Sequence, residues 1–114
     1  MKLFKTIDEK FADLGFVKKS EDKYGVTYDK EIYLHRELRD LTISEYDHTH
    51  RIFIGYKRNG NHIIQSFDPA LFDVNNIGNC CCGLTEKEAK LSLKKMKEMR
   101  RKYGWYVKNR KDLY

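Results

Sequence analysis

Large apolar residues near the N-terminus recur at the spacing of an amphipathic helix. Separations of three, four and three positions relate Phe4, Ile7, Phe11 and Leu14. Because this spacing gathers the four side chains on one helical face, it predicts a helix over about residues 2–14. Gly15 is the left-handed residue that commonly ends a helix, and Phe16 follows it where it can pack back on Phe11.

From residue 24 to residue 67 the pattern becomes typical of β-strands, with many β-branched and aromatic residues. Apolar and polar residues alternate at positions 26–28 and again at positions 41–44. Residues 31–38 are ambiguous, because their apolar positions suit either a strand or a helical turn, and we favour a strand. The alternation predicts an antiparallel sheet of four or five strands.

The dipeptide Asn59-Gly60 lies between two apolar runs and marks the tip of a β-hairpin. Both residue types accept positive φ angles, so they fit a two-residue type I′ turn. Such a turn also sets the register of the two strands. It pairs Tyr56 with Ile63, Ile54 with Gln65 and Ile52 with Phe67. We expect this set of side chains to face the core, since it is the more apolar of the two faces.

A second helix is predicted near the C-terminus, after the turn-rich segment 70–83. Thr85 and Glu88 have the T-x-x-E spacing of a capping box that opens a helix. The helix is expected to run to about Lys102 and to end near Gly104. The order of elements predicts a single α+β domain over residues 1–114. In it, an N-terminal helix and a longer C-terminal helix pack on the same face of a four- to five-stranded antiparallel sheet.

One side of the C-terminal helix is apolar and is expected to form part of the core. At about 100° per residue, a single arc of about 120° collects Ala89, Leu93, Met96, Met99 and Tyr103. Leu91 falls outside this arc, where it is either an exposed residue or a partner contact.

Next to the apolar arc, the same helix carries five cations in a straight line about 21 Å long. This basic stripe consists of Lys87, Lys90, Lys94, Lys97 and Arg101. Lys95 and Lys102 flank the opposite side. Like charges three or four residues apart on a helix repel each other by about 0.2–0.5 kcal/mol per pair. Uncompensated repulsion along one line favours an anionic partner that binds there. The simpler alternative is that these helix-forming residues are only a well-solvated face.

The formal net charge of +6 comes from the C-terminal part of the chain, where the last 30 of the 114 residues hold 11 basic and 4 acidic side chains. A localised positive field attracts phosphates or an acidic protein. The tail beyond the helix mixes rings and cations: Trp105, Tyr106, Lys108, Arg110 and Lys111. Such a tail can stack on bases and bind phosphates. In the alternative, Trp105 and Tyr106 fold back onto the core.

Residues that carry catalytic or metal chemistry are sparse. The consecutive Cys80–Cys82 form no disulfide framework, which favours a reducing compartment. His48 and His50 share one face of a strand. Together with the cysteines, and with His35 or His62, they are the candidate metal ligands, although adjacent cysteines lack the spacing of structural zinc sites. Without a nucleophile elbow or a Gly-rich phosphate loop, we expect no enzymatic activity and no cofactor.

Several segments together resemble a known class of proteins. They are F-x-x-L-G-F from Phe11 to Phe16, the stretches 22–26 and 60–66, and Gly83-Leu84-Thr85 ahead of residues 93–97. This layout resembles small proteins encoded in prophages and mobile elements of low-GC Gram-positive bacteria. The resemblance implies a compact α+β accessory protein, and some phage proteins of this size bind and block host defence machinery, including CRISPR effector nucleases. It transfers no site residue.

Three functions follow as hypotheses. The first is a non-enzymatic phage-type protein that modulates a host protein or protein–nucleic acid complex through the basic stripe. The second is direct, sequence-independent binding of nucleic acid by the stripe and the tail. The third is a metal-binding protein that uses His48, His50 and Cys80–Cys82. No apolar run approaches the ~20 residues of a membrane span, and the N-terminus lacks a signal-peptide core. We therefore expect a cytoplasmic location in a bacterial host cell and no membrane partner.

Overall fold

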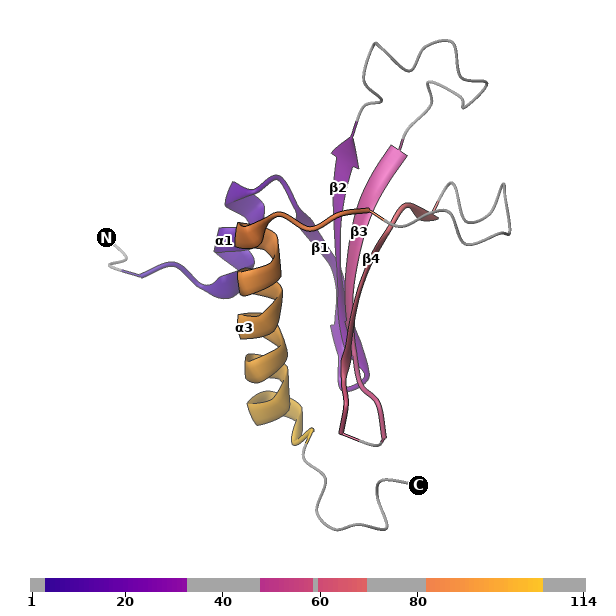
Figure 1. Ribbon diagram of the computed structural model, residues 1–114. Coiled ribbons are helices and arrows are strands. Elements are labelled where there is room, and N and C mark those ends of the chain that lie inside the picture. Colours follow the sequence, from indigo (N-terminus) through magenta and orange to yellow (C-terminus); the bar gives the residue numbers. More distant parts are fainter. Residues whose placement is uncertain (1–3, 33–47, 59, 70–81, 106–114) are drawn as a thin grey trace.

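A computed structural model of the chain describes residues 4–32, 48–58, 60–69 and 82–105 (Figure 1). Its elements are α1 (Ile7–Asp13), β1 (Val17–Asp22), β2 (Gly25–Ile32), β3 (His48–Gly55), β4 (Ile63–Phe67) and α3 (Glu86–Tyr103). The four strands form one antiparallel sheet in the order β1-β2-β3-β4. Helices α1 and α3 lie on the same face of that sheet, as Figure 1 shows. The predicted α+β architecture is confirmed.

Helix α1 begins later than the apolar spacing predicts, because a capping box fixes its first turn. The hydroxyl of Thr6 accepts a hydrogen bond from the Glu9 N–H, and the Glu9 carboxylate accepts one from the Thr6 N–H. Phe4 therefore lies outside the helix and is 85% exposed. The predicted end is confirmed: Gly15 has a φ of 96°, and the Phe16 ring packs 5.9 Å from that of Phe11.

Helix α3 begins and ends where its local signals predict. Thr85 and Glu88 form the second capping box, and Gly104 closes the helix in the left-handed conformation with a φ of 66°. The side chains that α3 buries are Glu88, Leu91, Ser92, Lys95, Met96 and Met99. Within the described residues, no helix combines the length and the apolar character needed to cross a membrane.

The buried face of α3 is rotated relative to the predicted arc. Met96 and Met99 are buried as expected, but Leu93 is 59% exposed whereas Leu91 is only 7% exposed. The predicted places of the two leucines are thus wrong. The reason is that α1 packs beside α3 on the Leu91 side, where Leu91 and Leu14 line the same pocket. This contact extends the buried side of α3 toward α1.

Strand β1 is an element that the hydrophobic pattern does not predict. Its residues are almost all exposed and polar, as befits the edge of a sheet. The turn into β2 is formed by the Asp22 side chain, whose Oδ1 accepts hydrogen bonds from the N–H groups of Tyr24 and Gly25. Residues 33–47, which include most of the ambiguous segment and the predicted alternation at 41–44, lie outside the described residues.

The β3–β4 hairpin is confirmed, but its predicted register is wrong by one residue. The strands pair Ile54 with Ile64, Ile52 with Ser66 and Gly55 with Ile63. The Gly60 N–H donates to the Lys57 carbonyl at 3.0 Å, and Gly60 has a φ of 84°. A left-handed glycine that closes a longer turn adds one residue to the loop and shifts the pairing.

The described core lies between the sheet and the two helices. It consists of Phe11, Phe16, Val26, Tyr28, Ile52, Ile54, Leu91, Met96, Met99 and Trp105. The ring of Phe11 stacks on that of Tyr28 with 3.9 Å between centroids, which joins α1 to the middle of the sheet. Ile52 and Ile54 are fully buried, so the expectation that they face the core is confirmed. The expected core face of β4 is wrong, because the shifted register brings Ile64 against the core and leaves Gln65 exposed.

Candidate anion-binding surface

The basic stripe lies on the solvent side of α3. All five of its side chains are exposed: Lys87, Lys90, Lys94, Lys97 and Arg101. The opposite side of the helix carries Ser92 and Met99, which are completely buried. At about 100° per residue, the centre of the stripe is therefore turned away from the sheet.

Most of the stripe is without a counter-ion among the residues that the structure describes. Lys90 pairs with Glu86 one turn earlier, with 2.6 Å between nitrogen and oxygen, and both side chains are largely exposed. Within the parts of the chain that the structure describes, no carboxylate lies within ion-pair distance of the other four stripe cations. Their charge is thus directed at solvent or at another molecule.

The nearby acidic residues are instead held by a different set of cations. Lys95 is 1% exposed, and its ammonium group lies 2.8 Å from Glu21, 3.2 Å from Glu98 and 3.3 Å from Asp8. Lys18 pairs with Asp8, and Lys102 pairs with Glu21. This ionic cluster joins α1, β1 and α3. Lys95, which the sequence places on the side of α3 opposite the stripe, is buried there because three carboxylates compensate its charge.

The pKa values in the ionic cluster follow from competition between burial and contacts. Burial alone would raise the pKa of Glu21, but hydrogen bonds from Lys102, Lys95 and Tyr103 outweigh it and hold the pKa well below 4.5. Burial likewise lowers the pKa of Lys95, yet the hydrogen bond to Glu21 and the charges of Asp8 and Glu98 raise it above 10.5. Glu21 and Lys95 are therefore both ionised at neutral pH.

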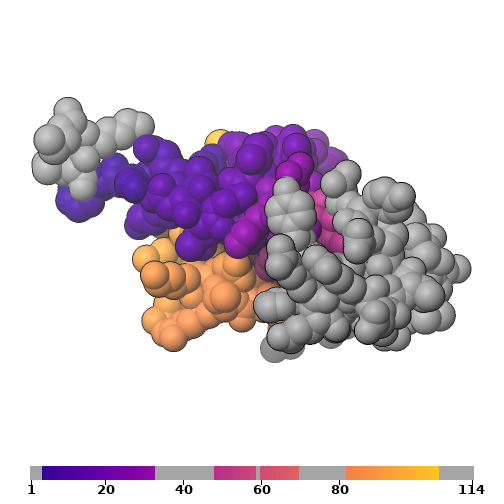
Figure 2. Space-filling model, turned by 90° about the horizontal axis from the view of Figure 1, so that it is seen from above, coloured from indigo at the N-terminus to yellow at the C-terminus, as the bar shows by residue number. Residues whose placement is uncertain are grey.

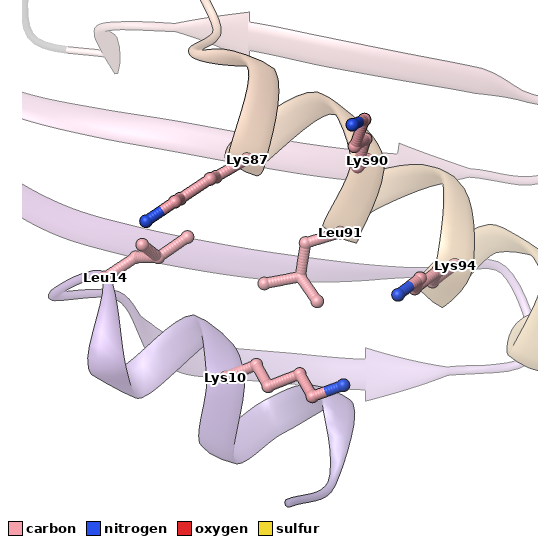
Figure 3. A pocket seen from close by; sticks show the side chains of 6 residues that line it. All are labelled: Lys10, Leu14, Lys87, Lys90, Leu91 and Lys94. Atoms are coloured by element: carbon pink, nitrogen blue, oxygen red, sulfur yellow. The ribbon is translucent and has the colours of Figure 1, made fainter.

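A small pocket opens between α1 and α3 beside the stripe. Its volume is about 270 Å³, and it is lined by Lys10, Leu14, Lys87, Lys90, Leu91 and Lys94. Figure 3 shows Leu91 pointing from α3 toward α1, with Lys87 reaching over Leu14 at one end and the amines of Lys94 and Lys10 at the other. In the space-filling view of Figure 2, the atoms of α1 and of the first part of α3 form one continuous surface.

Sequence reasoning found the three lysines that α3 contributes to this pocket and gave Leu91 as an exposed residue or a partner contact, but it missed Lys10 and Leu14. Nothing in the spacing of α1 shows that Lys10 and Leu14 face the stripe. Their place depends on how α1 packs against α3, which is a tertiary contact. The periodicity of one helix describes only its own faces, so the pocket could be seen only in the folded chain.

Trp105 is a core residue and offers no ring for stacking on a base. It is 3% exposed, and its indole N–H donates to the Lys23 carbonyl at 2.7 Å. Its ring packs against Tyr56 and His62. The structure therefore shows the alternative in which Trp105 folds back. Tyr106 and the predicted contact residues Lys108 and Arg110 lie outside the described residues.

The two strand histidines are buried and have separate partners. The Nδ1 of His48 lies 2.7 Å from an Asp68 oxygen, and the Nε2 of His50 lies 2.6 Å from the Ser66 hydroxyl oxygen. Burial, followed by the charge of Lys30, lowers the pKa of His50. Cys80 and Cys81 lie outside the described residues, and within the remainder no group of three or more His, Cys, Asp or Glu side chains is arranged to hold a metal ion.

Comparison with known proteins gives no relative from which to transfer a role. No protein-family model, no curated protein and no solved structure matches the chain. Any functional conclusion must therefore come from the charges, exposure and contacts of the residues themselves.

Proposed function

We propose that the protein is a non-enzymatic binding protein that modulates or inhibits a host nucleic-acid-handling or defence complex, such as a CRISPR effector nuclease, by placing its basic stripe on an acidic surface. The observation that carries the proposal is the pairing pattern on α3. Four of the five exposed stripe cations have no carboxylate partner among the described residues, whereas the buried Lys95 has three.

Physical chemistry supports a binding role for such a surface. Aligned, exposed cations produce a positive potential that accelerates association with an anionic partner at low salt. The rigid helix holds the five charged residues in line over about 21 Å, so the backbone does not have to be ordered on binding. A host complex as the target is the part of the proposal that rests only on the layout resemblance stated in the sequence analysis.

A capture experiment with charge-reversed variants tests the proposal. Tagged protein is incubated with a Gram-positive host lysate, and the captured proteins are identified by mass spectrometry. The wild type is expected to capture a nuclease or another defence protein. Lys94→Glu with Lys97→Glu is expected to reduce that capture by at least about tenfold, which corresponds to 1.4 kcal/mol.

The matched control reverses two cations that lie outside the stripe. Lys57→Glu with Arg58→Glu changes the net charge by the same amount, and both side chains are exposed at the tip of the β3–β4 hairpin. This control is expected to capture the target as well as the wild type does. Equal capture by all three proteins would show that the stripe is not the binding surface.

The second candidate function is direct binding of nucleic acid, which is also favoured by the four stripe cations that have no carboxylate partner among the described residues. Gel shifts with duplex DNA test it. If the stripe binds phosphates, the logarithm of affinity falls against the logarithm of salt concentration with a slope of about −0.9 per phosphate contacted. Absence of a shift at about 50 mM salt excludes this candidate and leaves the protein-partner proposal intact.

A further inference from the structure

We propose that the pocket between α1 and α3 receives one large apolar side chain from an acidic segment of the partner protein. This inference rests on the proposed function, because three of the lysines that line the pocket belong to the basic stripe. It adds the chemistry of the partner: an aromatic or long aliphatic residue flanked by carboxylates.

The first argument is the size and lining of the pocket. Its volume of about 270 Å³ is below the range of roughly 300–1,000 Å³ that is usual for small-molecule sites. Leu14 and Leu91 supply its apolar part, and Figure 3 shows them between the lysines of the two helices. A pocket of this size with an aliphatic floor suits the side chain of a single protein residue.

The second argument is charge complementarity around that floor. All four charged residues that line the pocket are lysines. Lys90 pairs with Glu86, but within the described ranges Lys10, Lys87 and Lys94 have no carboxylate at ion-pair distance. Carboxylates on both sides of an inserted apolar residue would pair with these ammonium groups at the rim, where partial desolvation strengthens the attraction.

The lining also favours a protein segment over nucleic acid. Proteins that bind single strands without sequence preference stack the bases on aromatic rings. The pocket is lined by lysines and leucines alone, and Trp105 is buried in the core. Phosphates would satisfy the cations but would make no apolar contact with the parts of Leu14 and Leu91 that line the pocket.

The third argument is that the pocket is preformed. Leu91 is part of the core, and Lys95 on α3 contacts Asp8 on α1 at 3.3 Å. Phe11, three residues before Leu14, is fully buried against Tyr28. Because these contacts fix both helices, an inserted side chain does not have to order the pocket walls, which lowers the entropic cost of binding.

A pair of synthetic peptides provides the probe. Fluorescein-labelled EDEFEDE and EDEAEDE have the same charge and differ only in the central ring, and their affinities are measured by fluorescence anisotropy at about 150 mM salt. We expect the phenylalanine peptide to bind at least about tenfold more tightly. Equal affinities, or no binding of either peptide below about 1 mM, would overturn the inference.

Variants of the pocket show whether the ring enters it. Leu14→Ser removes part of the floor and Leu14→Trp fills the space, and neither changes a charge. Both are expected to abolish the difference between the peptides, with circular dichroism used to verify folding. Lys10→Glu is expected to weaken the binding of both peptides and to preserve the ratio of their affinities. Lys57→Glu is the matched control and is expected to change neither affinity. A tenfold ratio that persists in both folded Leu14 variants would place the ring elsewhere and overturn the inference.

The outcomes separate this inference from the proposed function. If the Leu14 variants capture the host target as the wild type does, while Lys94→Glu with Lys97→Glu does not, the stripe is confirmed and the pocket is excluded. If the pocket discriminates between the peptides but the stripe variant still captures the target, the proposed function fails and the pocket stands. Tighter binding of a single-stranded oligonucleotide than of EDEFEDE at equal salt would count against the pocket's proposed occupant.

Discussion

The ammonium group of Lys95 lies 2.8 Å from a carboxylate oxygen of Glu21, and the two side chains are only 1% and 6% exposed. This contact joins the C-terminal helix to the edge strand β1. It also explains why neighbouring lysines of α3 have different environments. Lys94 points toward solvent in the basic stripe, whereas Lys95 is enclosed by three carboxylates.

Replacement of these neighbouring lysines by alanine is expected to change the free energy of unfolding by very different amounts. Lys95→Ala leaves the buried Glu21 carboxylate and the partly exposed Asp8 carboxylate with fewer counter-ions and should lower the free energy of unfolding by about 3 kcal/mol. Lys94→Ala should change it by less than about 0.5 kcal/mol, because the side chain is exposed and has no ion pair with a described residue. Urea denaturation measures both values. Equal effects would contradict the burial of Lys95.

The depressed pKa of Glu21 predicts a specific pH dependence of stability. The folded state holds the carboxylate ionised below the ordinary pKa of 4.5, so the unfolded state binds the additional proton as the pH falls. The stabilisation is therefore complete above about pH 4.5 and is lost toward lower pH. In Glu21→Gln, the free energy of unfolding between about pH 4.5 and pH 2 should decline less steeply than in the wild type.

Urea denaturation at several pH values measures that slope. Asp8 also has a lowered pKa, because hydrogen bonds from Lys18 and Tyr28 outweigh its burial, and it should keep part of the acid sensitivity in the variant. Parallel curves for the wild type and Glu21→Gln would show that Glu21 is not the group responsible.

Leu91 and Leu93 provide a second matched pair. Leu91 is a core residue, so Leu91→Ala should lower the free energy of unfolding by about 2–3 kcal/mol. Leu93 is exposed, and Leu93→Ala should change it by no more than about 0.5 kcal/mol. Thermal unfolding followed by circular dichroism distinguishes the two. A larger loss of stability in Leu93→Ala than in Leu91→Ala would contradict the observed orientation of α3 and support the apolar arc that the sequence predicts.

The ring of Phe53 excludes side chains at two glycines. A Cβ atom at Gly55 would lie 2.8 Å from the Phe53 ring, and one at Gly25 would lie 2.8 Å from the Ile54 carbonyl oxygen. Gly55→Ala should therefore destabilise the protein by about 1 kcal/mol, and Phe53→Leu should recover part of that loss. Gly25→Ala should be recovered less by Phe53→Leu, because the Ile54 carbonyl oxygen would still obstruct the Cβ atom after the ring is removed. A double-mutant cycle measures both couplings, and additive effects in the Gly55 pair would contradict the contact.

Elements whose signals are local could be predicted from the sequence. The bounds of α3 follow from Thr85, Glu88 and Gly104, and the exposure of the basic stripe follows from its spacing. The end of α1 follows from Gly15 and Phe16 in the same way. These features depend on residues within one or two turns of each other.

Features that depend on contacts between distant segments could not be predicted in this way. A lysine is ordinarily a surface residue, and the burial of Lys95 requires Asp8 and Glu21, which lie more than 70 positions away. Strand β1 has no apolar alternation, because an edge strand needs none. The hairpin register depends on the backbone conformation of Gly60, which the Asn-Gly dipeptide leaves open.

Trp105 is the one tryptophan of the chain, and it lies against the hairpin where α3 ends. Its emission spectrum is consequently an intrinsic optical signal for the docking of that end of the helix. Because the pocket is lined by residues of α1 and of the first half of α3, a ligand there need not touch the fluorophore. The fluorescence of Trp105 thus reports folding at the C-terminal end of α3 without an added label. A dye used to follow binding at the N-terminal end of α3 gives a separate signal.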